Sequence, residues 1–326
     1  MSVSVVMVVR DEPRSRVQRA LDAVAIQEGV DGISVVIAAP EADHADLAGL
    51  STTGAVAEVR LVANPTGGRS AGLNRAIAAA PDGVVVRVDA RSVVPPGYVA
   101  ACVARLAVDL SVGIVGGGQR PTAIDDDAGP RGIARALRNP WLLGNAAYRR
   151  PGAAGPVDTV YLGAFRRDEV LALGGYDERL VANEDFDLAR RVRDQGKVVW
   201  LEPDLEVAYE PRADWGGLAR QYHAFGVAKV RFWRLTGERP NRRQQVAIAG
   251  GALAGIAALL SLRRPGRALA LAVAACVGGA MLDHVADPDE RDLQVRSRAL
   301  AASAVIVTSW LVGVLSGLLR PGRDLR

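Results

Sequence analysis

Cysteine, histidine and aromatic side chains are scarce in this sequence. Its 326 residues include two cysteines, Cys102 and Cys276, which lie far apart among apolar neighbours. We interpret both as small buried hydrophobic residues, so a disulfide framework is not expected. The three histidines are scattered along the chain, so a histidine-based metal site is not expected.

Two further features are missing. The chain begins with a strand-like run from Ser2 to Val9, without the basic start and apolar core of a secretory signal peptide. We therefore expect the N-terminal part to lie in the cytoplasm. The net charge is +4 and arginine-rich, which suits phosphate contacts. Because no basic run is interleaved with aromatic residues, a nucleic-acid partner is not expected.

The N-terminal part alternates between strand-like and helix-like segments. Apolar, β-branched runs that predict buried strands occur at 3–9, 33–39, 58–62 and 84–88. Between them, Val17, Leu21 and Val24 share one face of a predicted helix, and a second helix is predicted at 71–80. This alternation is typical of an α/β fold with a mostly parallel central sheet, whose ligands bind at the carboxyl edge.

The middle of the chain is less regular. Residues 116–156 are rich in glycine, proline and arginine, with helical pieces around 133–137, and we interpret them as a functional loop region. Asn183 is then predicted to be the N-cap of a helix with acidic residues in its first turn. A short strand is expected at 197–201.

The composition changes after Gly237. Three apolar stretches follow, at 246–262, 268–282 and 299–319. A membrane span needs about 20 apolar residues, so the third is long enough, the first is marginal and the second is short. For the first two, a buried helical hairpin or a shallow re-entrant pair is the alternative. Positive charge at most of the ends leaves the orientation open. We predict a domain at 1–237 and a membrane-associated helical region at 238–326.

Acidic residues lie where this pattern places the carboxyl edge of the sheet. Asp89 directly follows a predicted strand, where an acid reaches a bound divalent ion or a ribose. Asp185 at the start of a helix is held ionised by the dipole and can accept a proton. Each has an ordinary alternative, a turn cap for the first and helix stabilisation for the second. The basic, aromatic segment 220–234 is typical of an interfacial helix or of one that closes over a diphosphate.

The order and spacing of these segments resemble the family 2 glycosyltransferases, and among them the succinoglycan-type enzymes that build bacterial exopolysaccharide on lipid carriers. The resemblance covers about the first 235 residues, and the co-occurrence of its motifs is more specific than any one of them. The matching segments are Ser4–Glu12, Ser70–Asn74, Arg87–Ala90, Val157–Arg166, Gly174–Glu178 and Asn183–Asp185.

This resemblance implies a GT-A fold, in which a nucleotide-binding sheet joins an acceptor-binding half. It implies an inverting transfer from a nucleotide-sugar donor, with a UDP-sugar as first choice, to a lipid-linked or polysaccharide acceptor of cell-envelope synthesis. A divalent cation, Mg²⁺ or Mn²⁺, is the implied cofactor. The catalytic part would lie on the cytoplasmic face of the cell membrane.

The resemblance also assigns roles to residues. It implies that Asp185 is the catalytic base, that Glu184 orients the site, and that Asp89 lies near the metal and the donor ribose. The further donor-binding residues are Glu12, Asn74, Arg91, Arg220 and Gln221. The acceptor pocket is assigned Asp158 and Tyr161.

Two departures from the family pattern keep alternatives open. Relatives carry a second acid or a histidine where this chain has Arg91, a cation that binds the diphosphate directly or signals altered activity. The second strand ends in Ala38–Ala39–Pro40 instead of an Asp–Gly pair, with Glu41 or Asp43 as substitutes. A non-catalytic membrane scaffold is therefore one rival. A nucleotidyltransferase is another, although the expected glycine-rich phosphate loop does not follow the first strand.

Overall fold

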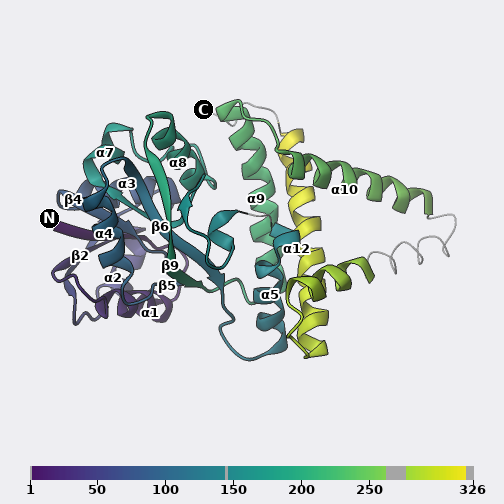
Figure 1. Ribbon diagram of the computed structural model, residues 1–326, viewed down its shortest axis with the longest axis horizontal. Coiled ribbons are helices and arrows are strands. Elements are labelled where there is room, and N and C mark those ends of the chain that lie inside the picture. Colours follow the sequence, from purple (N-terminus) through teal and green to yellow (C-terminus); the bar gives the residue numbers. More distant parts are fainter. Residues whose placement is uncertain (1, 144–145, 262–276, 321–326) are drawn as a thin grey trace. The chain divides into compact units, whose positions relative to one another are not determined.

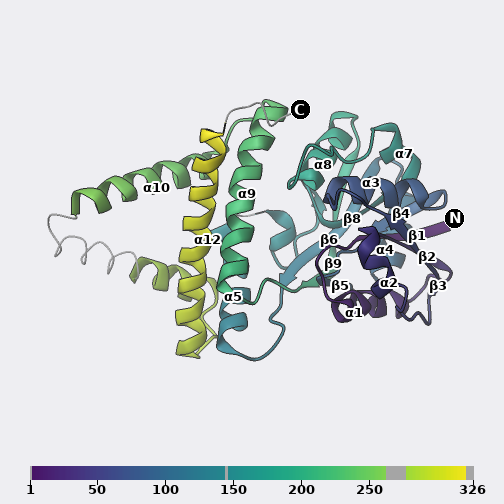
Figure 2. The ribbon, with the colours of Figure 1, turned by 180° about the vertical axis from the view of Figure 1, so that it is seen from behind.

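The structure, a computed structural model, describes residues 2–143, 146–261 and 277–320. The chain divides into two compact units, which Figures 1 and 2 show from opposite sides. The first, here called the sheet unit, consists of Met1–Arg120 and Ala146–Tyr209. The second, the helical unit, consists of Pro121–Asn145 and Glu210–Arg326. The predicted boundary after Gly237 differs from this division, because α9 (Trp215–Thr236) packs with the C-terminal helices.

The sheet unit is built on one mixed sheet with strand order β3-β2-β1-β4-β8-β6-β9-β5, and β7 pairs with β9. The strands are β1 (Ser2–Val8), β2 (Ile33–Ala39), β3 (Val56–Ala63), β4 (Gly83–Arg87), β5 (Ser92–Val93), β6 (Val112–Pro121), β7 (Gly155–Pro156), β8 (Tyr161–Arg166) and β9 (Val198–Tyr209). The four from β3 to β4 are parallel, as predicted. Beyond β4, the pairs β4–β8, β6–β8, β5–β9 and β7–β9 are antiparallel, so the sheet is mixed instead of mostly parallel.

Helices cover both faces of this sheet, as Figure 1 shows. On one face, α1 (Arg14–Ala25) and α4 (Tyr98–Val108) pack against alternate residues of β1, β2 and β4. On the other, α3 (Arg69–Ala79), α7 (Arg167–Ala172) and α8 (Glu184–Asp194) do the same. Val17, Leu21 and Val24 are fully buried on α1, which confirms the predicted face. A short 3-10 turn (Glu41–Asp43) and α2 (His44–Leu47) follow β2.

Two strands of the sheet occupy sequence that did not predict them. β6 runs through Gly116 and Gly117 into the predicted loop region, and a Cβ at Gly117 would lie 1.8 Å from the Leu205 carbonyl oxygen of β9. Only glycine allows that close approach. β8 is also interrupted, because Leu162 takes a left-handed conformation (φ 50°) that bulky residues rarely adopt. Neither segment shows the continuous or alternating apolar pattern by which strands are recognised.

The helical unit is organised around α12 (Leu293–Leu319). Its first half packs on α5 (Ala128–Arg138) and its second half on α9. Small residues make the contacts close: a Cβ at Gly313 would lie 2.1 Å from the His223 carbonyl oxygen of α9. Arg234 of α9 donates from Nη2 to the Leu318 carbonyl oxygen at 3.0 Å, near the end of α12. The short α6 (Pro140–Leu143) follows α5 in the same unit.

Another helix of this unit, α10 (Arg242–Ser261), has mostly exposed apolar side chains on its described turns. Its apolar side chains Val246, Leu253 and Ile256 are 72%, 67% and 54% exposed. The predicted apolar stretch at 268–282 lies mostly outside the described residues. Within the described ranges, α12 alone is long and apolar enough to cross a membrane, by length and composition. A buried ion pair between Arg135 of α5 and Asp283, 2.9 Å from Nε to Oδ1, ties α5 to the helical segment 277–286.

Candidate active site

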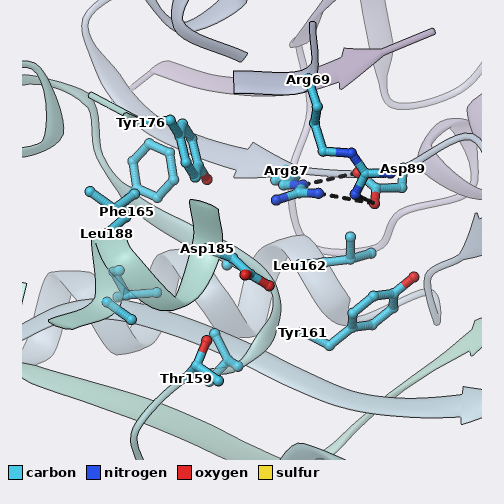
Figure 3. Close-up of a pocket in the computed structure, with 14 residues that line it drawn as sticks. Arg69, Arg87, Asp89, Thr159, Tyr161, Leu162, Phe165, Tyr176, Asp185 and Leu188 are labelled. Atoms are coloured by element: carbon cyan, nitrogen blue, oxygen red, sulfur yellow. Dashed lines mark hydrogen bonds and ion pairs between the residues drawn. The ribbon is translucent and has the colours of Figure 1, made fainter. Parts of the chain in front are cut away.

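A cavity of about 80 Å³, partly open to solvent, lies in the sheet unit just beyond the carboxyl end of β4. That is the edge at which the sequence predicted the site. The cavity is bounded by β8, by the start of α3 and by the first turns of α8, as Figure 3 shows. Its lining residues are Arg69, Arg87, Asp89, Ile114, Thr159, Val160, Tyr161, Leu162, Gly163, Phe165, Tyr176, Asp185, Leu188 and Ala189.

Two arginines and two carboxylates form a charged cluster in this cavity. Arg87, the last residue of β4, donates from Nε to Oδ1 of Asp89 at 2.9 Å and from Nη2 to Oδ2 at 3.1 Å. Its Nη1 lies 3.4 Å from Oε1 of Glu184. Arg69, the first residue of α3, lies 3.4 Å from Asp89 and 3.8 Å from Glu184. The predicted residues Asp89 and Glu184 are thus brought together through arginines that the sequence analysis did not select.

A signal for both arginines was present in the sequence. Arg87 stands two residues before Asp89, and side chains two apart on an extended segment point to the same side. Arg69 opens a helix after Gly67–Gly68, at the carboxyl edge of a parallel strand. Recognising them requires knowing which acids they face, and that depends on contacts between residues 97 positions apart, as for Arg87 and Glu184.

Burial and these charges set the ionisation of the two acids in opposite directions. Burial by itself would raise the pKa of Asp89, but the Arg87 and Arg69 guanidinium groups lower it to about 2. The pKa of Glu184 is raised, by burial first and by the neighbouring Asp185 carboxylate second. Asp89 is therefore a fixed anion at neutral pH, held in place by a two-pronged arginine contact.

Asp185 is the exposed acid of the site. Its carboxylate points into the cavity on the side of the Arg87–Asp89 pair, as Figure 3 shows. It accepts a hydrogen bond from the Phe186 backbone nitrogen at 2.7 Å, and within the described ranges it takes part in no ion pair. Asp187, two residues on, is buried and bound by Arg191 at 2.8 Å. One acid of this first turn thus holds the structure together, and the other is left facing the cavity.

The turn before α8 sets this orientation. Asn183 occupies the N-cap position, as predicted, but with a left-handed backbone (φ 67°) and no side-chain hydrogen bond to the helix start. A left-handed N-cap residue does not place its side chain over the first amides of the helix. Asparagine tolerates this conformation better than most residues. The chain reverses there and delivers Glu184 into the charged cluster and Asp185 to the cavity.

The two residues assigned to the acceptor pocket lie differently. Tyr161 lines the cavity, and its hydroxyl lies 2.7 Å from Oγ of Ser92. Burial raises the pKa of Tyr161, so its hydroxyl stays protonated. Asp158 is an exposed residue outside the lining set, and its Oδ1 accepts from Nη1 of Arg193 at 2.9 Å. The structure thus brings Tyr161 into the site and leaves Asp158 at the surface.

Three of the assigned donor-binding residues, Asn74, Arg91 and Glu12, have structural partners. Asn74 donates to the Tyr176 carbonyl oxygen at 2.9 Å and accepts from the Tyr176 backbone nitrogen at 2.8 Å, which ties α3 to the segment before α8. Arg91 donates from Nε to Glu12 at 2.7 Å, and the same carboxylate accepts from Arg16 at 2.6 Å. The side chains of Asn74, Arg91, Glu12 and Arg16 are not among those lining the cavity. Arg91 is thus a half-buried partner of Glu12 instead of a cation facing the cavity.

Arg220 and Gln221 belong to α9 in the helical unit, and their proposed contact with the donor stays a prediction. Glu41 and Asp43, the substitutes named for nucleotide-base recognition, lie in the 3-10 turn after β2. That turn follows a parallel strand at the carboxyl edge of the sheet, where ligands of such folds bind.

The side chains at this edge do not fit a protein-held divalent cation. Among the described residues, no group of three or more His, Cys, Asp or Glu side chains is placed to hold a metal ion. Both carboxylate oxygens of Asp89 are engaged by Arg87, and the next position with a charged side chain is Arg91, a cation. Mg²⁺ and Mn²⁺ favour oxygen ligands supplied in number, which this set does not offer.

Comparison with known proteins places this geometry in context. No family model matches the chain. The succinoglycan biosynthesis protein ExoA of Rhizobium meliloti (strain 1021) is 27% identical over 205 residues, which are 61% of this chain and 60% of that protein. The chain thus matches about three fifths of the length of this relative. The similarity confirms the resemblance to succinoglycan-type proteins that the motifs indicated.

Solved structures give the fold. The mannosyltransferase PcManGT from Pyrobaculum calidifontis, in complex with GDP-Man and Mn²⁺, aligns with a TM-score of 0.55 and 18% identity over 97% of this chain and 87% of that chain. GalNAc-T7 with UDP, GalNAc and Mn²⁺ aligns with a TM-score of 0.47 and 15% identity, over 71% of this chain and 49% of that chain. The first alignment shows that the chain has the GT-A fold predicted from its sequence.

Proposed function

We propose that this protein transfers a sugar from a nucleotide-sugar donor to an acceptor hydroxyl, with inversion at the anomeric carbon. One observation carries the proposal: the Asp185 carboxylate faces a cavity at the carboxyl edge of a GT-A sheet, beside the Arg87–Asp89 pair. A base and a charged group that face one cavity fit a single displacement. The match to ExoA and the shared fold support the reaction class.

The reaction follows from the chemistry of these groups. The acceptor hydroxyl attacks the anomeric carbon from the side opposite the diphosphate, and Asp185 accepts the hydroxyl proton. The new carbon–oxygen bond forms as the bond to the diphosphate oxygen breaks, and the nucleoside diphosphate leaves with the electron pair. Glu184 holds Arg87 and Arg69 within 3.8 Å of its carboxylate and so positions the cluster beside the base. Tyr161 lines the same space as a neutral hydroxyl.

The identity of donor and acceptor rests on the resemblance. We propose a UDP-sugar as the first donor to test, and a GDP-sugar as the second, because PcManGT was solved with GDP-Man. The acceptor we propose is a lipid-linked or polysaccharide chain of cell-envelope synthesis, supported by the match to a succinoglycan biosynthesis protein. The predicted divalent cation is supported by the Mn²⁺ of PcManGT, whereas the residues of this site supply no ligand set for it.

We further propose that the protein acts at the cell membrane with its sheet unit in the cytoplasm. The helical unit exposes apolar side chains on α10 and on one face of α12, including Leu253, Val312 and Leu315. Exposed apolar surface of this extent is costly in water and marks contact with another apolar phase. Arg242, at the start of α10, is exposed and suits anionic lipid headgroups.

The rival hypothesis is a non-catalytic membrane-bound binding subunit. The pairing of Arg91 with Glu12, where the family pattern has a second acid or a histidine, favours it. Calorimetric titration of the full chain with UDP- and GDP-sugars, followed by measurement of nucleotide release, separates the two. A subunit that only binds gives heat of binding without release of nucleoside diphosphate in the presence of any acceptor.

The Asp185→Asn variant tests the proposed function. Removing the base should lower the transfer rate by about 10²–10⁴-fold and leave donor affinity unchanged, because the carboxylate acts on the acceptor proton. Nucleoside diphosphate release and calorimetric titration measure the two quantities. Asp194→Asn, an exposed acid at the other end of α8, is the matched control and should keep full activity. Undiminished transfer by the Asp185 variant would refute the assignment.

A further inference from the structure

We infer that Arg69 compensates the charge of the leaving diphosphate in this protein, so that donor binding and transfer proceed without a divalent cation. The inference rests on the proposed function and concerns the same cavity. When the sugar–phosphate bond breaks, the leaving group gains one negative charge, and a nearby positive group must stabilise it. Fold relatives hold Mn²⁺, but here the positive groups of the cavity are guanidinium groups.

The three arginines near this edge are not equivalent. The Arg87 side chain is only 7% exposed, and its two-pronged contact with Asp89 occupies it. Arg91 is held by Glu12, which is itself shared with Arg16. Arg69 differs from both, because it lines the cavity and its side chain is 52% exposed. It is therefore the arginine of this cluster best placed to meet a ligand from solvent.

The contacts of Arg69 suit exchange of partners. Its nearest carboxylate oxygens, on Asp89 and Glu184, lie 3.4 and 3.8 Å away, which is long for a charge-assisted hydrogen bond. A diphosphate oxygen at the normal distance of such a bond would compete well with them. Arg69 is also the first residue of α3, an eleven-residue helix, where the helix dipole adds positive potential. Asp89 keeps Arg87 as its partner while Arg69 turns to the phosphate.

The arginine partners of Asp89 explain why a divalent cation would be disfavoured at this site. A divalent ion at Asp89 would have to displace Arg87 from both oxygens of that carboxylate, leaving the buried guanidinium with the more distant carboxylate of Glu184. A divalent ion at Asp89 would also approach the positively charged Arg69. Buried charges are costly without partners, so the arginine cluster and a bound cation exclude one another at this site.

Calorimetric titration of the full chain in detergent with UDP, and with GDP, tests this inference, first with EDTA and then with MnCl₂. We expect the two dissociation constants for the nucleotide that binds to differ by less than about twofold. Arg69→Gln should weaken binding by roughly 10- to 100-fold in both buffers, the size of one lost charge-assisted contact. Arg69→Lys keeps the charge but loses the planar, forked guanidinium. Its affinity for the nucleotide should lie between those of the unmodified protein and Arg69→Gln.

A matched control is Arg60→Gln. Arg60 is 50% exposed and lies 3.8 Å from Glu58 on β3, so its exposure and its ion pair resemble those of Arg69, but it does not line the cavity. It should bind the nucleotide like the unmodified protein. The thermal midpoint of each variant checks that it is folded.

The outcomes separate this inference from the proposed function. Binding that needs Mn²⁺ would overturn the inference and leave the glycosyltransferase proposal standing. Equal loss of affinity in the Arg60 and Arg69 variants would also overturn it. Failure of the unmodified, folded protein to bind either nucleotide in either buffer would overturn both. Transfer activity retained in EDTA, and lost with Arg69→Gln, would support it.

Discussion

At the residue scale, the site depends on charges that stabilise one another across the chain. Asp89, Arg87 and Glu184 are almost enclosed by protein, and each lies within 3.4 Å of an oppositely charged group. Leu162 in the cavity wall has a left-handed backbone (φ 50°), which costs about 1–3 kcal/mol and persists only where surrounding contacts impose it. Paired charges and a strained backbone thus both occur at this cavity, although in different residues.

The lowered pKa of Asp89 has a consequence for stability. A carboxyl whose pKa is lower in the folded than in the unfolded chain stabilises the fold above its unfolded value, and this contribution is lost as the pH falls through the folded value. For Asp89 the pKa is 3.8 in the unfolded chain and about 2 in the folded chain. Asp89→Asn should therefore unfold at lower temperature at pH 7, with a loss of about 2 kcal/mol.

The pH dependence of this loss is the measurement. The difference in thermal midpoint between Asp89→Asn and the unmodified protein should stay constant from pH 7 to about 5 and narrow as the pH falls below about 4. Asp46→Asn, an exposed acid on α2, is the control and should leave the midpoint unchanged throughout. A difference that grows as the pH falls would contradict the ionised state assigned to Asp89.

At this scale, local position in the sequence was enough to place two acids at the carboxyl edge of the sheet, and their roles stay predictions. Asp89 after a strand and Asp185 in a first helical turn were recognised in that way, and both line the cavity. Arg69 and Arg87 were not selected, because an arginine acquires meaning only through the acids it meets. Arg91 was weighed as a diphosphate ligand, but its partner Glu12 lies 79 positions away.

At the element scale, two apolar helices that look alike in sequence have different surroundings. α12 buries a stripe of small and branched residues, including Ala299, Ala302 and Ile306, against α5 and α9. α10 has an apolar surface that is exposed on most of its described turns. Hydropathy selects α12 as the span, whereas packing makes α12 the central helix of its unit. The two criteria measure different properties, and only the structure separates them.

A pair of glycine substitutions distinguishes the two helices. Gly313→Ala on α12 should lower the thermal midpoint by several degrees, because its Cβ would overlap the His223 backbone and overpacking costs about 1–3 kcal/mol. Gly250→Ala on α10 should leave the midpoint unchanged or slightly raised, because its Cβ would meet no atom within 4 Å and alanine favours helix. Thermal unfolding in one detergent measures both. Equal destabilisation would contradict the packing of α12 on α9.

At the scale of the whole molecule, the sheet unit and the helical unit differ in where their apolar side chains lie. The sheet unit has two apolar cores, one on each face of its sheet, covered by helices. The helical unit has a buried Arg135–Asp283 pair inside and apolar side chains outside. Exposed apolar surface of this kind is consistent with the proposed contact with lipid.

Vesicle binding tests this arrangement. Replacing Leu253 and Ile256 of α10 together by aspartate should weaken binding to vesicles of phosphatidylcholine and phosphatidylglycerol by at least about tenfold, because charged groups are costly in an apolar phase. Replacing Val108 and Leu110 by aspartate is the control: they are 84% and 71% exposed, but they belong to the sheet unit. Sedimentation with the vesicles measures binding. Equal loss in both variants, or no loss in the first, would contradict contact between α10 and lipid.

The sequence by itself determined the parallel half of the sheet and the two acids at its carboxyl edge, because hydrophobic period and helix-end chemistry are local properties. Its motifs indicated the GT-A fold by their resemblance to a known family. The tertiary structure alone decided the antiparallel half, where Gly117 interrupts the apolar pattern and Leu162 takes a left-handed backbone conformation. It also decided which arginine faces the cavity and which is held by an acid. Ion pairs join residues far apart in the chain, and no local pattern records which guanidinium meets which carboxylate.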